Sequence, residues 1–162
     1  MQVLDGQYLS LPLANLHRTP GFTPERETNL APGELITAIK VPMADHARSA
    51  YVKVRDRASY AFALVSAAVS LTLDNNGPVT HCAIALGGFA TKPWCATTAE
   101  AMMIGQTVTR ITSVAASRAA LVEATPTHDQ EFKVDLACRV IAKAIMEASG
   151  QAQAPAHVGL KI

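Results

Sequence analysis

A β-hairpin pattern constrains the fold of this chain more than any other feature of its sequence. From Ala63 to Leu73, apolar residues fill every second position, which is the period of a strand with one buried face. The sequence Asp-Asn-Asn-Gly follows at 74–77, and Asn and Gly tolerate the positive φ angles of tight turns. A second alternating segment, Val79–Leu86, then turns Ile84 inward. The two segments predict an antiparallel hairpin with one face toward a core.

Two more strands are expected ahead of this hairpin. Residues Leu35–Val41 alternate in the same way, and Pro42 ends them because proline has no backbone N–H for the ladder. Residues Ser49–Arg57 place Val52 and Val54 on one face and three cations on the other. Together with the hairpin, these segments predict a small antiparallel β-sheet of three to four strands.

The periodicity changes to that of helices after the strands. Helices are predicted at 97–104, where Thr97 and Glu100 form a capping-box sequence, at 112–124 and at 130–148. Strands that are followed by helices, rather than alternating with them, are typical of an α+β fold. We therefore expect a small antiparallel sheet followed by a three-helix layer.

Proline content divides the chain of 162 residues into three parts. Residues 1–32 are rich in prolines and turns, and they predict an irregular lead-in. Residues 33–150 hold all the periodic segments and are expected to form one domain of ordinary size. Residues 151–162 lie beyond Gly150 and predict a disordered tail.

Charge and hydropathy exclude several classes of partner. A formal net charge of +1 argues against a nucleic acid or an anionic membrane surface. No apolar run approaches the roughly 18 residues of a membrane-spanning helix. The N-terminal segment lacks the basic stretch and apolar core of a secretory signal, so a cytoplasmic location is expected.

The sequence contains no recognisable catalytic or metal-binding pattern. Its five histidines are isolated, and its three cysteines are far apart and in no CxxC spacing. A nucleophile elbow, a P-loop and a GxGxxG fingerprint are all absent from the sequence. We therefore assign no catalytic residue and no metal ligand, and we expect reduced, mostly buried thiols.

The segment KVRDRASY, from Lys53 to Tyr60, is the strongest candidate for a binding site. Lys53, Arg55 and Arg57 share one strand face, just ahead of a stretch of small apolar residues. One interpretation is that these cations have no ligand and simply prevent the edge strand from pairing with another sheet. Alternatively, one of them binds the anionic group of a ligand while the apolar end of the strand enters the core.

Four segments, in the same order, resemble one protein family. PGELITAIKVP, YVKVRDRASYAFALVSAAV, IALGGFATKPW and AEAMMIG are similar to the C-terminal domain of the FAD-binding subunit of molybdenum hydroxylases. This group contains xanthine dehydrogenase, carbon monoxide dehydrogenase and aldehyde oxidoreductases. The resemblance is greatest to the flavin subunits of bacterial aldehyde oxidoreductases, and it covers residues 9–148.

The resemblance implies a place in an electron-transfer chain. In that family electrons leave the substrate at a molybdenum cofactor, cross two 2Fe-2S clusters in a partner subunit and reach FAD. An N-terminal domain holds most of the FAD, and the C-terminal domain adds contacts at the isoalloxazine ring. The implied partners are therefore an N-terminal FAD-binding domain, an iron–sulfur subunit and a molybdenum subunit.

No glycine-rich FAD domain is present in this sequence. Residues 1–32 are therefore expected to be the remnant of a junction with such a domain. The chain by itself is expected to be inactive as an oxidoreductase. Because aldehyde oxidoreductases of this kind can be exported as assembled complexes, the periplasm is the alternative to a cytoplasmic location.

Two positions match the family's contacts to the flavin ring, Ile36 in GELITAI and Lys53 in KVRDRASY. A cation at the pyrimidine edge of a flavin stabilises electron density there and raises the flavin potential. Tyr60 stands where xanthine dehydrogenases carry an acidic residue, and it is a third candidate, lying against the ring. Two alternatives stay open: a non-enzymatic interaction module or truncated remnant that does not bind FAD, and an unrelated small-ligand binder.

Overall fold

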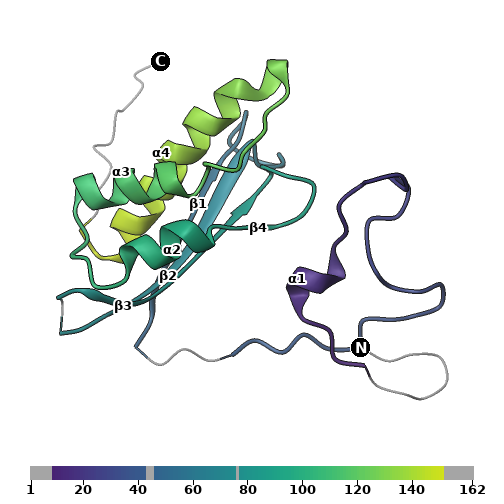
Figure 1. Ribbon diagram of the computed structural model, residues 1–162, viewed down its shortest axis with the longest axis horizontal. Helices are drawn as coiled ribbons and strands as arrows, with labels where there is room; N and C mark the ends of the chain where they lie inside the picture. Colours follow the sequence, from purple (N-terminus) through teal and green to yellow (C-terminus); the bar gives the residue numbers. More distant parts are fainter. Residues whose placement is uncertain (1–8, 43–45, 76, 152–162) are drawn as a thin grey trace.

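The computed structural model describes residues 9–42, 46–75 and 77–151. In chain order its elements are α1 (Leu13–Leu16), β1 (Arg48–Val54), β2 (Val65–Leu73), β3 (Val79–Gly87), β4 (Trp94–Cys95), α2 (Thr97–Met103), α3 (Arg110–Ala119), the 3-10 helix η1 (His128–Gln130) and α4 (Glu131–Ala148). The four strands form one antiparallel sheet in the order β1-β2-β3-β4. Helices α2, α3 and α4 lie together on one side of it (Figure 1). The predicted α+β fold is confirmed.

The predicted hairpin is formed by β2 and β3. Asn75 takes a φ angle of 43°, the left-handed conformation that the turn sequence predicts. The register sets Val69 opposite Ile84 and Leu71 opposite Cys82, and all four side chains are buried. A slip of one residue would turn these side chains to the opposite face, so the buried pattern fixes the register.

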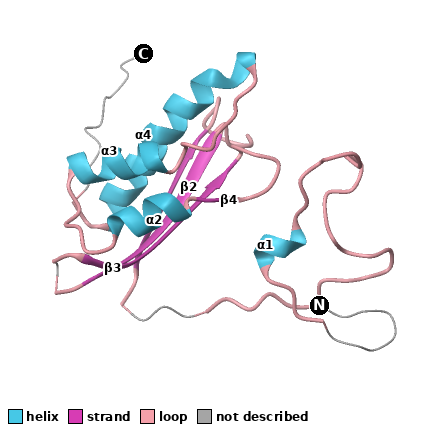
Figure 2. Ribbon diagram, in the orientation of Figure 1, coloured by secondary structure: helices cyan, strands magenta, loops and turns pink. Residues whose placement is uncertain are grey.

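Helix α4 provides the main cover of the sheet, packing against β1 and β2. Its buried side chains are Ala137, Val140, Ile141, Ala144, Ile145 and Ala148. This stripe confirms the amphipathic pattern of the sequence, and its alanines allow the helix axis to lie close to the strands. Helix α2 packs against β3, and α3 packs against both α2 and α4 (Figure 2).

Trp94 lies on β4, at the edge of the sheet, and packs against the core. Its indole Nε1 donates a hydrogen bond to the Ala120 carbonyl at 3.0 Å. The ring of Phe89 meets the indole edge-on, with the ring centroids 5.4 Å apart. The tryptophan thereby ties the sheet to the end of α3.

The predicted strand at Leu35–Val41 is wrong. Leu35 forms a single β-bridge, and residues 36–41 form no strand in this structure. The sheet instead gains its fourth strand from β4, a two-residue element that no periodicity could predict. Strand alternation is therefore present at 35–41, but within the described ranges no neighbouring strand completes the ladder.

The predicted capping box at Thr97 is also wrong. Helix α2 is preceded by Ala96 and has no side-chain cap, because the Glu100 carboxylate accepts the Ile84 N–H at 2.8 Å instead. A capping box does occur at α3, where Thr109 and Thr112 exchange side-chain and backbone hydrogen bonds. The Glu100 carboxylate thus stabilises β3 rather than the start of its own helix.

Residues 9–32, the described part of the predicted lead-in, contain α1 and a single β-bridge between His17 and Thr28. Leu13 is exposed and Phe22 is fully exposed. The predicted tail lies outside the described residues from 152 onward. None of the helices in the described ranges combines the length and the apolar character needed to cross a bilayer.

The stability of the fold at alkaline pH is expected to depend on Cys82. Burial, and to a lesser extent the Glu100 carboxylate, raises the pKa of this thiol from 9.0 to about 12. Between these two values the unfolded chain binds fewer protons than the native state, so stability falls as the pH rises.

Compared with Cys82→Ala, the wild type should therefore lose about 2 kcal/mol more of its free energy of unfolding between about pH 8 and 10.5. Urea unfolding at the two pH values measures this difference. Equal losses in the two proteins would mean that this thiol does not titrate differently in the two states.

Candidate functional site

The face of the sheet opposite the helices, called here the open face, is built mainly from small side chains. Its central residues on β2 and β3 are Ser66, Ala68, Ser70, Ala83, Ala85 and Gly87. Alternation places them opposite the buried apolar side chains of the same strands. Because none of these side chains extends beyond a methyl or hydroxymethyl group, the centre of the open face offers a flat surface.

Lys53 stands at the β1 rim of the open face. Antiparallel pairing sets it opposite Ser66, and Ser66 opposite Gly87, so the three residues form one row across the sheet. The Lys53 side chain is exposed, and within the described ranges it makes no hydrogen bond or ion pair. The ammonium group is therefore available to an anionic ligand or partner.

At the β3 end of this row, the backbone of the two glycines lies very close to residues of the neighbouring chain segment. A Cβ atom on Gly87 would lie 2.8 Å from the Ser66 hydroxyl oxygen. At Gly88, which has a φ angle of +68°, a Cβ atom would lie 2.7 Å from the Ala63 carbonyl oxygen. Gly88 is thus required where β3 ends beside β2, whereas a side chain at Gly87 would need the Ser66 hydroxyl to move.

The next row along the open face has larger residues at its two ends. Tyr51 of β1 pairs with Ala68, which pairs with Ala85, which pairs with Cys95 of β4. Tyr51 and Cys95 are both exposed. An aromatic ring and a thiol therefore flank the flat centre, and the expectation of mostly buried thiols holds for Cys82 but not for Cys95.

The three predicted flavin contacts lie in three different parts of the chain. Lys53 is on β1, and Tyr60 is in the β1–β2 loop with φ +53° and a fully solvent-exposed ring. Ile36 is half exposed in the irregular segment that precedes β1. Among the described residues, no hydrogen bond joins any two of them. Of these three residues, Lys53 is the one that stands on a strand of the sheet.

The other two cations of KVRDRASY are not on a strand, because β1 ends at Val54. Arg57 donates a hydrogen bond from its guanidinium to the Tyr60 carbonyl at 2.6 Å, which holds the loop in its turn. Arg55 is exposed in the same loop. The predicted strand at 49–57 was three residues too long, and the shared cationic face is reduced to Lys53.

Sequence reasoning missed the small-residue surface beside Lys53. Its signal is the alternation of Ser66, Ala68 and Ser70 on one strand with Ala83 and Ala85 on the next. Each residue is unremarkable by itself, since alanine and serine are common in any position. Only the register between β2 and β3 shows that they form one continuous patch.

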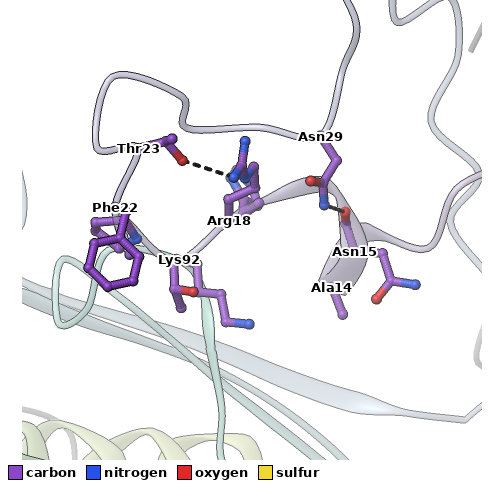
Figure 3. Close-up of a pocket in the computed structure, with 11 residues that line it drawn as sticks. Ala14, Asn15, Arg18, Phe22, Thr23, Asn29 and Lys92 are labelled. Atoms are coloured by element: carbon purple, nitrogen blue, oxygen red, sulfur yellow. Dashed lines mark hydrogen bonds between the residues drawn. The ribbon is translucent and has the colours of Figure 1, made fainter.

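A separate pocket of about 500 Å³ lies between the N-terminal segment and the β3–β4 loop (Figure 3). Arg18, Phe22 and Lys92 line it, and the Arg18 guanidinium donates a hydrogen bond to the Thr23 hydroxyl at 3.0 Å. Asn29 donates to the Asn15 carbonyl at 2.6 Å and closes the side formed by α1. The pocket is polar, and most of its wall comes from residues ahead of the sheet.

Within the described ranges, no three His, Cys, Asp or Glu side chains lie close enough together to hold a metal ion. The described part of the chain therefore offers no candidate metal site.

Comparison with known proteins assigns the sheet and its helical layer to a family. The sequence profile of the CO dehydrogenase flavoprotein C-terminal domain matches residues 49–148. This chain belongs to that family. The matched range contains the sheet, except for the first residue of β1, and helices α2, α3 and α4.

Individual relatives extend the match beyond the family domain. The chain is 42% identical over 148 residues to the aldehyde oxidoreductase FAD-binding subunit PaoB of Escherichia coli, covering 91% of this chain and 43% of that protein. Most of the residues ahead of position 49 therefore lie within this match. The chain spans less than half the length of this curated relative.

Solved structures share the same fold. Reconstituted CO dehydrogenase from Oligotropha carboxidovorans matches with a TM-score of 0.69 and 26% identity, over 77% of this chain and 45% of that one. Quinoline 2-oxidoreductase from Pseudomonas putida matches with a TM-score of 0.68 and 22% identity, over 76% of this chain and 44% of that one. The second likeness concerns the fold alone, and both agree with the family assignment.

Proposed function

We propose that this chain is the C-terminal part of the FAD subunit of a molybdenum-dependent oxidoreductase of the aldehyde or xanthine type. Residues 33–150 form the domain at the ring side of the flavin, and residues 1–32 form the junction with an N-terminal FAD-binding domain. FAD is shared between the two domains, and it relays electrons from iron–sulfur clusters to an acceptor. The molybdenum cofactor and the 2Fe-2S clusters belong to partner subunits.

The observation that carries this proposal is the open face with Lys53 at its rim. An isoalloxazine ring is flat and has a polar, electron-accepting edge, and it needs a surface without protruding side chains. In the row of Lys53, Ser66 and Gly87, an exposed cation stands beside two small residues, because the Ser66 hydroxyl is buried and donates to the Gly87 carbonyl at 3.4 Å. The residues present therefore fit a planar ring with an anionic edge.

Lys53 has the clearest role in this arrangement. Its exposed ammonium group, which has no partner in the described part of the chain, would lie near the pyrimidine edge and stabilise negative charge there. Ile36 and Tyr60 would add apolar contact to the ring once their segments are held in place by the neighbouring domain. Both residues are exposed in this structure, so each has surface to bury.

A titration with FAD tests this proposal. The purified chain is titrated alone, and again together with the part of the E. coli FAD-binding subunit that this chain does not match, with flavin absorbance and fluorescence as signals. We expect binding only in the combined sample, because the pyrophosphate and adenosine would be held by the other domain. Absence of binding in both samples would leave the chain as an interaction module or remnant, and Lys53 as an edge-strand charge.

Replacing Lys53 by methionine should lower the potential of the bound flavin by about 30 mV, because it removes the cation that stabilises the reduced ring. FAD retention during gel filtration should fall as well. Arg55→Met removes the same charge from the adjoining loop and serves as the control, with little expected effect. Dye-equilibration titrations of the reconstituted complex measure both potentials. Equal shifts in the two variants would remove Lys53 from this role.

A further inference from the structure

Tyr60 is held in a backbone conformation that large side chains rarely adopt. Its φ angle of +53° lies in the left-handed region, where the Cβ atom crowds the following carbonyl oxygen. Among the described residues other than glycine, His46 and Asn75 also have a positive φ angle, and both are of types that are enriched in this region. Tyrosine is not such a type, so the structure around Tyr60 has to hold it there.

Packing of the tyrosine ring does not provide this hold. Tyr60 is 96% exposed, and in the described part of the chain its ring contacts no other aromatic ring. A fully solvated ring makes no contact that would offset the strain of its own backbone. The ring of Tyr60 is thus presented to solvent by a conformation that another residue fixes.

Arg57 is that residue. Its guanidinium Nη2 donates a hydrogen bond to the Tyr60 carbonyl at 2.6 Å, across a turn of four residues. A charged donor makes the stronger kind of hydrogen bond, and the planar guanidinium fixes its direction. Arg55, two residues earlier, carries the same charge but makes no hydrogen bond or ion pair within the described ranges. The bond to Tyr60 is therefore what distinguishes the two arginines.

The loop that carries Arg57 and Tyr60 leaves the sheet at the end where Lys53 stands. The Leu64 N–H donates to the Val54 carbonyl at 2.8 Å and closes the β1–β2 hairpin directly beyond Lys53. The backbone one residue earlier packs against the end of β3, as the close approach at Gly88 shows. The return of the loop is thus anchored to two strands, while its remaining residues are mostly exposed.

We propose that Arg57 is a positioning residue for the flavin: its hydrogen bond holds Tyr60 in the left-handed conformation, in which the tyrosine ring is set to lie against the isoalloxazine. This inference rests on the proposed function and adds to it a residue that does not touch the flavin. The neighbouring domain would fix the loop as a whole, and Arg57 would set the conformation of Tyr60 within it. Because this backbone is ordered before FAD arrives, less conformational entropy is lost on binding.

The affinity for FAD tests this role in the chain combined with the part of the E. coli FAD-binding subunit that it does not match. Arg57→Met removes the donor, and we expect it to weaken FAD binding about three- to tenfold, the effect of one hydrogen bond. Arg57→Lys retains a donor and should recover most of this loss. Arg55→Met removes the same charge without breaking a hydrogen bond, and it should leave the affinity unchanged. Equal affinities for Arg57→Met and Arg55→Met would overturn the inference.

NMR of the free chain tests the backbone part without FAD. A positive φ angle brings the N–H and Hα protons of one residue close together, so Tyr60 should give a strong NOE between them in the wild type and in Arg57→Lys. We expect this NOE to lose its strength in Arg57→Met, because the backbone then relaxes toward negative φ angles. An NOE that is weak in the wild type, or as strong in Arg57→Met, would contradict the role of Arg57.

A double-mutant cycle shows whether Arg57 acts through Tyr60. In Tyr60→Gly the left-handed conformation carries no strain and the ring is absent, so the hydrogen bond has no side chain to position. In this background Arg57→Met should change the affinity for FAD by less than about twofold, because its effect depends on the tyrosine. The same loss in both backgrounds would reject the inference, since Arg57 would then act on FAD by another route.

Failure of this inference is distinguishable from failure of the proposed function. FAD binding by the combined chains with no difference between Arg57→Met and Arg55→Met would keep the function and reject the positioning role. No FAD binding by the wild-type combination would reject both, whatever the NOE at Tyr60.

Discussion

The Leu71→Ala variant is expected to lose about 3 kcal/mol of its free energy of unfolding relative to the wild type. Leu71 is fully buried on β2, where it pairs with Arg48 on β1 and with Cys82 on β3. Truncation removes three buried carbon atoms, a methine and two methyl groups, and leaves a cavity that helix α4 cannot fill without moving, which typically costs about 2–5 kcal/mol.

Urea unfolding followed by circular dichroism measures the loss at Leu71. Ser70→Ala is the matched control. The Ser70 side chain is next to Leu71 in the sequence but lies on the open face, so its truncation should change the free energy of unfolding by less than about 0.5 kcal/mol. A loss below about 1 kcal/mol for Leu71→Ala would mean that the sheet and helices do not enclose a packed core. That result would contradict the whole fold, including the open face.

The second large effect is expected at Gly88. Replacement by alanine should cost about 3 kcal/mol, because the new Cβ atom would lie 2.7 Å from the Ala63 carbonyl oxygen in addition to the strain of a φ angle of +68°. The end of β3 would have to move away from β2. Since Gly87 precedes it, the row with Lys53 should be disturbed as well.

Gly105 provides the control for this substitution. It also has a positive φ angle, +75°, but a Cβ atom there would meet nothing within 4 Å. Gly105→Ala should therefore lose only about 1 kcal/mol, the cost of the backbone conformation alone. Thermal unfolding of the two variants separates steric clash from backbone strain, and equal losses would show that the close approach at Gly88 is absent.

The sequence predicts the buried half of this protein much better than its open face. The positions of β2, β3 and α4 follow from periodicity, because each buries a regular stripe and the same residues decide both the element and its packing. The segment at 35–41 shows the limit of this reasoning. Its alternation is real, but a strand needs a neighbour, and the neighbour is not specified by the segment itself.

The candidate site was predicted only in part for a similar reason. Lys53 stands out as a cation at the start of an apolar strand, whereas the flat surface beside it depends on the pairing of β2 with β3. Glu100 illustrates the same point in the helical layer, because its sequence context predicts a helix cap while its carboxylate accepts a hydrogen bond from Ile84. Contacts between elements decided both outcomes.

The most direct test of the central claim is an NMR titration of the ¹⁵N-labelled chain, which at 17.1 kDa is well suited to it. The unlabelled N-terminal part of the E. coli FAD-binding subunit is added with and without FAD. We expect the FAD-dependent amide shifts to be largest at Lys53, Ser66 and Gly87, and small throughout α3. Shifts on the helical layer, or none that depend on FAD, would contradict a flavin at the open face.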